Sequence, residues 1–190
     1  AKDRLFDAII CDVPCSGDGT IRKDAHILPG WTPNTSNALH ALQLSLLERA
    51  IQCAKVGGIV SNSTCSLNPV EDEAVVAGVL QRAASNKSGP VVELQSWPTM
   101  PGFCARPGVS HWLVADYDAE HDEEDDDDPH LRWHSGMDEA MERGMTNACA
   151  SMWPPEESDT AASCLEKCVR LHPQDHASGG FFVALFKRIK

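Results

Sequence analysis

Two short apolar segments joined by one long amphipathic segment constrain the fold of this chain most strongly. Residues 6–13, FDAIICDV, form a short apolar run that ends at Pro14. Such a run is typical of a strand buried on both faces of a parallel sheet. Apolar residues recur at helical spacing over residues 35–55, which predicts a helix of about five turns. Residues 59–66, IVSNSTCS, then predict a second strand.

This strand–helix–strand order indicates an α/β fold, because a helical crossover of this kind joins parallel strands. In open α/β sheets, ligands bind beyond the carboxyl ends of the parallel strands. Asp12 and Cys15 lie at that end of the first strand, and Cys65 lies at that end of the second. We therefore expect two segments fifty residues apart to meet over one crevice.

The remaining elements are less regular. Residues 69–83 predict a second helix that begins at Pro69 and carries Glu71 and Glu73 near the positive end of its dipole. Acids at a helix start are most often caps, although these two could also organise a site. The further candidates, in chain order, are strands at 91–96 and 111–116, a short helix at 134–145, and an antiparallel hairpin of 168–171 with 181–186.

The charge of the chain is concentrated in one segment. The net charge is −12, and ten carboxylates lie between Asp116 and Asp128. Removing those ten negative charges leaves about −2 for the rest of the chain, which is nearly balanced. We interpret residues 116–129 as a solvated, disordered acidic loop rather than a calcium site or a docking tail for a basic partner.

Length and composition favour one globular domain: the chain has 190 residues, of which 42% are hydrophobic. No apolar run approaches the roughly 20 residues of a membrane-spanning helix, and the first residues lack a secretory pattern, so we expect an intracellular protein. Free thiols are therefore expected at the eight cysteines, and Cys164 and Cys168 should face the core from a helix. The absence of C-x-x-C pairs argues against a structural metal.

Two motifs at the strand ends carry the chemistry. Residues 12–19, DVPCSGDG, combine a carboxylate, a thiol and a glycine turn, which allow close approach of a flat ligand. Residues 63–73, STCSLNPVEDE, place Cys65 between a strand and a helix start, where amide groups and the dipole favour a thiolate. A lone cysteine is more often a buried structural residue. Two thiols and a carboxylate on one rim favour catalysis instead.

Together these motifs resemble those of the NOL1/NOP2/Sun family of RNA cytosine-5 methyltransferases. An Asp-x-Pro-Cys-Ser-Gly segment and a Thr-Cys-Ser-x-x-Pro-x-Glu-x-Glu segment are both complete, at residues 12–17 and 64–73. Residues 170–173 and 179–184 are similar to the family's last hairpin, and residues 31–51 resemble its eukaryotic tRNA branch. The resemblance implies the carboxy-terminal part of a Rossmann-like class I methyltransferase domain over residues 1–190. Its sheet would be mostly parallel, with an antiparallel hairpin at the carboxyl end.

The resemblance also implies a mechanism. Cys65 would add to C6 of cytosine, and the activated C5 would take a methyl group from S-adenosylmethionine. Asp12 would hold the cytosine edge and contact the cofactor, and Cys15 would help release the product. Most of the S-adenosylmethionine site would lie before residue 6, so we expect this chain alone to bind the cofactor poorly or not at all and to be inactive by itself. The resemblance implies RNA as the partner, and tRNA in particular, with no DNA, no membrane and a nuclear or nucleolar location.

Three alternatives remain at this stage. A thiol hydrolase or redox protein would need a histidine beside Cys15 or Cys65, and neither motif contains one. An enzyme that methylates the adenine amino group commonly uses an aromatic residue where this chain has Cys15. A catalytically inactive RNA-binding or assembly module could keep the same fold, although Asp12, Cys15 and Cys65 are all present.

Overall fold

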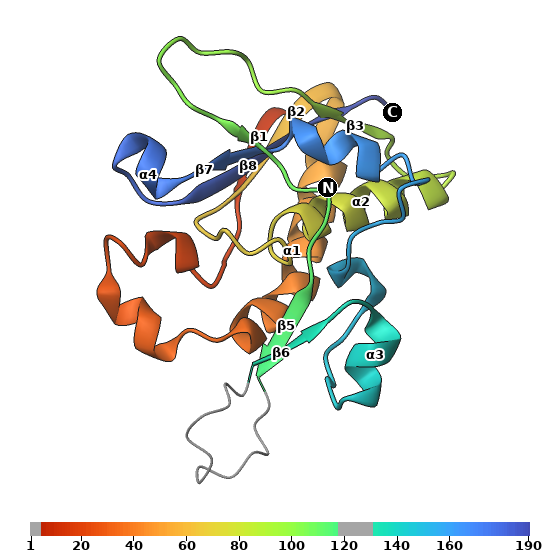
Figure 1. The fold of residues 1–190 in the computed structure, drawn as a ribbon. Coiled ribbons are helices and arrows are strands. Elements are labelled where there is room, and N and C mark those ends of the chain that lie inside the picture. Colours follow the sequence, from red (N-terminus) through yellow and green to blue (C-terminus); the bar gives the residue numbers. More distant parts are fainter. Residues whose placement is uncertain (1–4, 118–130) are drawn as a thin grey trace, which may run out of the picture.

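The computed structural model describes residues 5–117 and 131–190, and its main element is a six-stranded sheet (Figure 1). The strands run in the order β1-β2-β8-β7-β4. Strand β3 also pairs with β8, on the same edge as β7 but nearer the carboxyl end of β8. Their bounds are β1 Phe6–Asp12, β2 Ala54–Thr64, β3 Val92–Gln95, β4 Arg106–Pro107, β7 Val169–Leu171 and β8 Phe181–Arg188.

The strand–helix–strand unit expected from the sequence is confirmed. Helix α1 spans Pro33–Cys53 and connects β1 to β2, which pair in parallel. It begins two residues earlier than expected because Pro33 suits the first turn of a helix, where its missing amide is not needed. The parallel register places Asp12 opposite Ser63, so both strands end at the same edge of the sheet.

The parallel share of the sheet is smaller than we expected. Only β1 and β2 pair in parallel among the described strands, and β8 runs antiparallel to β2, β3 and β7. The reason is the connection: β8 follows β7 after the short helix α4, Pro173–His176, and this hairpin brings it back beside β2 in the opposite direction. The carboxy-terminal antiparallel hairpin is itself confirmed.

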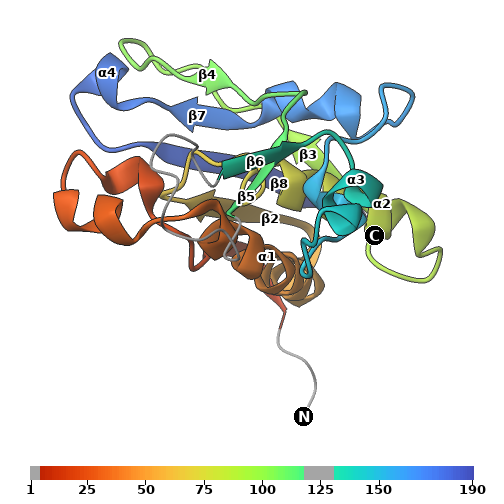
Figure 2. The same cartoon turned by 60° about the horizontal axis from the view of Figure 1, so that its bottom comes forward.

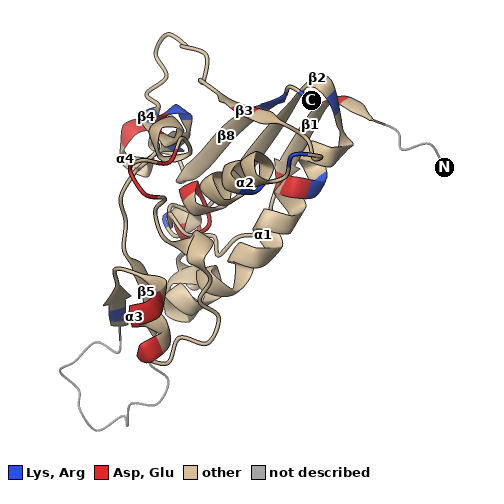
Figure 3. Cartoon of the chain, turned by 90° about the vertical axis from the view of Figure 1, so that its right-hand side faces the viewer, with Lys and Arg blue, Asp and Glu red and all other residues tan. Residues whose placement is uncertain are grey.

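Helices α1 and α2 lie side by side and cover one face of the sheet (Figure 3). Helix α2 spans Glu73–Ser85, and the core beneath the two helices includes Leu44, Leu47, Val60, Phe182 and Phe186. The expectation that residues 6–13 are buried on both faces is wrong, because Ile10 is 84% exposed. Alternate residues of β1 face opposite sides, and the helices cover only the side on which Ile9 packs.

Residues 112–117 and 131–153 form a second, smaller packing unit beside α1 (Figure 2). Strands β5, Val114–Tyr117, and β6, Leu131–His134, pair in antiparallel fashion and precede helix α3, Met137–Glu142. The strand and helix expected in this region are therefore confirmed. Its buried apolar residues are Val114, Ala140, Met145, Met152 and Trp153, and Val70, from the turn before α2, packs with them.

From residue 118, the acidic loop expected at 116–129 lies outside the described residues. Asp116, with which it was expected to begin, is instead a buried residue of β5. Arg132 and His134 both donate hydrogen bonds to its carboxylate. The Arg132 guanidinium and the His134 ring hold the pKa of Asp116 below its usual range, although burial opposes this.

All eight cysteines are free thiols, as expected. The helix expected around Cys164 and Cys168 is a 3-10 helix, η4, over Ala162–Lys167. Cys168 is buried, and Cys164 packs against the same core, so both face inward as expected. In the part of the chain that the structure describes, no helix is both long enough and apolar enough to cross a membrane.

Candidate active site

The two thiols singled out in the sequence lie in contact at the carboxyl ends of β1 and β2. Cys15 follows β1 by three residues and Cys65 follows β2 directly. Their Sγ atoms are 3.3 Å apart, although fifty residues separate them in the chain. Both are partly buried. The parallel register of the two strands thus produces the meeting that the sequence predicted.

The turn after β1 holds Cys15 in place. The carbonyl oxygen of Pro14 accepts a hydrogen bond of 2.9 Å from Nε2 of Gln43, which reaches it from α1. Gly17 has a φ of +77°, in the left-handed region that favours glycine, and allows the chain to reverse directly after Ser16. The glycine of the first motif is therefore required by the backbone of the turn.

The electrostatics of Cys15 favour its protonated form. Burial, together with the neighbouring Cys65 thiol, raises the pKa of Cys15 to about 12. At neutral pH its S–H group is intact and can be donated to the sulfur of Cys65.

The expected activation of Cys65 by a following helix dipole needs a correction. Helix α2 begins at Glu73, eight residues beyond Cys65, rather than at Pro69. The residues between form a tight turn in which the amide of Glu71 donates to the carbonyl of Asn68 at 3.0 Å. Helix dipoles act within about one turn, and Cys65 precedes the first turn of α2 by eight residues rather than by four.

Asp12 is the last residue of β1 and lies at the same edge of the sheet. Its Oδ1 accepts a hydrogen bond of 3.0 Å from the hydroxyl of Ser63, its register partner on β2. The residue is otherwise exposed to solvent. A carboxylate with accessible oxygens at a strand end can accept from an amino or hydroxyl group of a base or cofactor.

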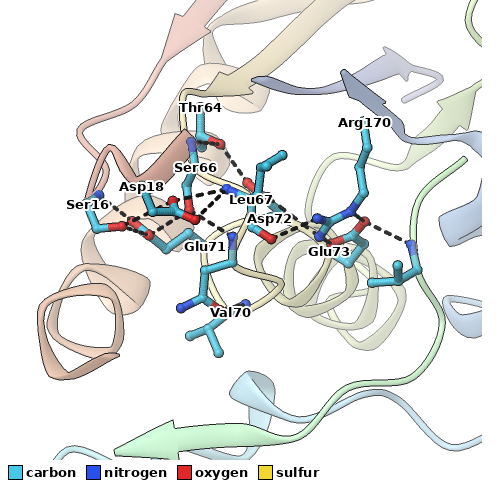
Figure 4. Close-up of polar contacts among 12 residues, drawn as sticks. Ser16, Asp18, Thr64, Ser66, Leu67, Val70, Glu71, Asp72, Glu73 and Arg170 are labelled. Atoms are coloured by element: carbon cyan, nitrogen blue, oxygen red, sulfur yellow. Dashed lines mark hydrogen bonds and ion pairs between the residues drawn. The ribbon is translucent and has the colours of Figure 1, made fainter. Parts of the chain in front are cut away.

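The acids that we expected to be helix caps are buried instead. Glu71, Asp72 and Glu73 are all 0% exposed. Glu71 accepts hydrogen bonds from Ser16 and Ser66, the residues that follow the two cysteines (Figure 4). Sequence reasoning considered an organising role for Glu71 and Glu73 but favoured capping. The run of three acids carries no signal for burial, because the partners that bind them, among them Ser16 and Arg170, are distant in the sequence.

A second set of contacts joins the two motifs. The amide of Leu67 donates to the Asp18 carboxylate at 3.0 Å, and the amide of Gly19 donates to the carbonyl of Cys65 at 3.0 Å. The Gly180 amide in turn donates to the carbonyl of Gly19 at 2.6 Å. A Cβ at Gly19 would lie 2.7 Å from the Cys65 carbonyl oxygen, so only glycine fits there. Burial raises the pKa of Asp18.

Arg170 on β7 neutralises the remaining buried acids. It donates to both carboxylate oxygens of Glu73 and, at 2.8 Å, to the carbonyl of Leu67 (Figure 4). Its Nη2 lies 3.6 Å from the Asp72 carboxylate, which also accepts from Thr64 at 2.6 Å. Although burial opposes the charge on Arg170, the Glu73 carboxylate raises its pKa. Burial raises the pKa of Asp72, and the charge of Glu73 adds to this.

Other features of the surface do not converge on this site. A groove of about 650 Å³ lies between α2, β3 and η4 and contains neither thiol. Among the described residues, no group of three histidine, cysteine or acidic side chains is placed to hold a metal ion.

The fold and the thiol pair define a Rossmann-like α/β domain of the methyltransferase type. A methyltransferase homolog protein from Pyrococcus horikoshii has a similar structure, with a TM-score of 0.53 and 27% identity over 97% of this chain and 39% of that one. The fold is also similar to that of NSun6 from the same organism, with a TM-score of 0.55 and 17% identity over 95% of this chain and 29% of that one.

The family model described as 16S rRNA methyltransferase RsmB/F matches residues 1–100, and the chain belongs to this family. It is 36% identical, over 96% of its length, to a Schizosaccharomyces pombe protein named multisite-specific tRNA:(cytosine-C(5))-methyltransferase. It is 35% identical, also over 96% of its length, to a Drosophila melanogaster protein named tRNA (cytosine(34)-C(5))-methyltransferase. The chain spans 24% and 22% of these two relatives.

Proposed function

We propose that the protein transfers a methyl group from S-adenosylmethionine to C5 of cytosine in RNA, and that tRNA is its substrate. Family membership and the names of the similar proteins support the reaction class. The observation that carries the proposal is the contact of the Cys15 and Cys65 sulfurs, 3.3 Å apart at one edge of the sheet. In this proposal residues 1–190 form the carboxy-terminal part of the catalytic domain.

Cys65 acts as the nucleophile. Its sulfur forms a bond to C6 of the cytosine, and the displaced electron pair makes C5 nucleophilic. Asp12 faces the N3 and amino edge of the base, where its accessible oxygens can accept from the amino group. A proton shared between its carboxyl group and N3 offsets the negative charge that accumulates there. The bound cofactor supplies the methyl group to C5. The cytosine must leave any base-paired stack to reach Cys65.

Cys15 acts in release. After methyl transfer, a base such as water takes the C5 proton, and the electrons of the C5–H bond form the C5–C6 double bond. The bond between C6 and the Cys65 sulfur then breaks with its electron pair on that sulfur, to which the Cys15 S–H can donate. Because the Cys15 sulfur lies next to that of Cys65, it is close to the place where this bond breaks. Its high pKa keeps it from competing as a nucleophile in the free protein.

S-adenosylmethionine fits the site only in part. Asp12 has an accessible carboxylate that can accept from the cofactor, and we propose that the other binding residues precede residue 6 in sequence. A nuclear or nucleolar location is also part of the proposal, by family resemblance. A catalytically inactive RNA-binding module of the same fold is the alternative, and the intact thiol pair argues against it.

A trapping experiment tests the proposal. The protein, produced at its full natural length, is incubated with tRNA and S-adenosylmethionine as wild type, Cys15→Ala, Cys65→Ala and the double variant. We expect 5-methylcytosine from the wild type, and a denaturation-stable protein–RNA adduct from Cys15→Ala that the second substitution removes. If no variant forms an adduct and no 5-methylcytosine appears, the inactive RNA-binding module becomes the better interpretation.

A further inference from the structure

Both thiols are followed by a serine, and both serines are bound by the same carboxylate. Oε1 of Glu71 accepts from the amide of Ser16 at 2.8 Å, and Oε2 accepts from the Ser16 hydroxyl at 2.5 Å. Oε2 also accepts from the hydroxyl of Ser66 at 2.9 Å. One side chain therefore joins the Cys15 turn to the Cys65 turn (Figure 4).

The environment of Glu71 makes it a rigid anchor. The residue is 0% exposed, and Oε1 receives a fourth hydrogen bond, of 3.0 Å, from Nε2 of Gln43. The same Gln43 nitrogen also donates to the carbonyl of Pro14, directly before Cys15. Four donors saturate the carboxylate, and bonds to a charged acceptor are stronger than those between neutral groups.

We propose that Glu71 is a positioning residue that sets the relative placement of the two reactive thiols, acting through Ser16 and Ser66. The inference rests on the function proposed above. The hydrogen bond from Ser66 to Glu71, here called the Ser66 arm, places the attacking sulfur of Cys65. The hydrogen bonds from Ser16 to Glu71, the Ser16 arm, place the sulfur of Cys15 that assists release. Because a misplacement of about 1 Å can cost about 100-fold in rate, a shift of either turn changes the step that its cysteine performs.

The two arms give different expected defects. Ser66→Ala removes the bond to Glu71 and the bond that the Ser66 hydroxyl accepts from the Asn68 amide, so adduct formation slows about 10-fold in the Cys15→Ala background, where breakdown is blocked. Ser16→Ala removes the hydroxyl bond at the Cys15 turn, so breakdown slows and an adduct accumulates although Cys15 is present. Glu71→Ala removes both arms and lowers overall methyl transfer by about 100-fold.

A conservative variant separates positioning from the need for a charge. Glu71→Gln keeps the shape, its oxygen can accept from the Ser16 amide and Gln43, and its NH₂ group can donate to the two serine hydroxyls if they rotate. We expect the methyl-transfer rate of Glu71→Gln to stay within about threefold of the wild-type rate. Such a result means that Glu71 does not need to exchange a proton during the reaction. Glu73→Ala is the matched control, because Glu73 is equally buried but binds Arg170 and the amide of Val109.

The test measures adduct formation rate, adduct fraction, 5-methylcytosine yield and melting temperature for each variant at full natural length. The inference holds if Ser66→Ala slows formation, Ser16→Ala raises the adduct fraction, and Glu71→Gln rescues Glu71→Ala. It is overturned if these variants only lower the melting temperature, or if Glu73→Ala changes the two steps in the same way. If Cys15→Ala itself traps no adduct and the wild type makes no 5-methylcytosine, the proposed function fails as well.

Discussion

Replacing Arg170 with methionine tests whether this arginine offsets the energetic cost of burying the Asp72 and Glu73 carboxylates. The Arg170 side chain is 6% exposed, and the side chains of Asp72 and Glu73 are 0% exposed. Removing one partner of a buried ion pair leaves an uncompensated charge and costs about 3–5 kcal/mol in the free energy of unfolding. At about 2–4 °C per kcal/mol for a chain of this size, the melting temperature should fall by about 6–20 °C.

The loss should depend on pH in a defined direction. Burial and the charge of Glu73 raise the folded-state pKa of Asp72 above its unfolded value of about 4, and without Arg170 no opposing charge lowers it. The folded state then binds this proton more tightly, so the variant is least destabilised near pH 4 and loses stability as the pH rises through the raised folded pKa of Asp72. The deficit relative to wild type should be larger at pH 8 than at pH 5.

Urea unfolding followed by circular dichroism at pH 5 and pH 8 measures both effects. Arg106→Met is the control, because Arg106 makes a similar bidentate pair with Asp175 while its side chain is 49% exposed. That substitution should cost at most about 1 kcal/mol. An Arg170→Met loss below about 1 kcal/mol, or one that does not change with pH, would refute the reasoning.

Three further predictions concern the site and its support. Iodoacetamide at pH 8 should label Cys65 before Cys15, because a pKa of about 12 leaves roughly one part in ten thousand of Cys15 as thiolate; preferential labelling of Cys15, seen by peptide mass spectrometry, would contradict this. Gly19→Ala should lower methyl transfer by about 100-fold, because the added Cβ meets backbone 2.7 Å away, whereas Gly30→Ala, with open space, should be neutral. Burial lowers the pKa of His40, so the free energy of unfolding should fall as the pH drops from about 6.5 toward the folded-state pKa of this residue. If the free energy of unfolding of His40→Gln falls with pH as steeply as that of the wild type, other groups cause the dependence.

The sequence predicted the parts of this structure that depend on local pattern. The β1–α1–β2 unit follows from an apolar run, a helical repeat and a second apolar run, and the meeting of Cys15 with Cys65 follows from parallel strands alone. The hairpin of β7 and β8 follows from two apolar segments around a turn.

What the sequence did not predict depends on partners distant in the chain. The pairing of β8 with β2 joins segments more than a hundred residues apart, and the sequence of neither strand indicates which strand it pairs with. The start of α2 was misplaced at Pro69 because proline suits a first turn, whereas the contacts of Glu71 and Asp72 hold that segment as a turn. The burial of these acids becomes visible only once Arg170 and the serines are in place.

The position of β8 has a consequence for how the chain is made. Strand β2 ends at Thr64, and the residues that pair with its second edge begin at Phe182. At about 5–20 residues per second, ribosomes need roughly 6 to 24 seconds to synthesise the stretch between them. During that interval the open edge of β2 can pair with other strands, of this chain or a neighbouring one, so the nascent protein is most exposed to misassembly before its last strand emerges.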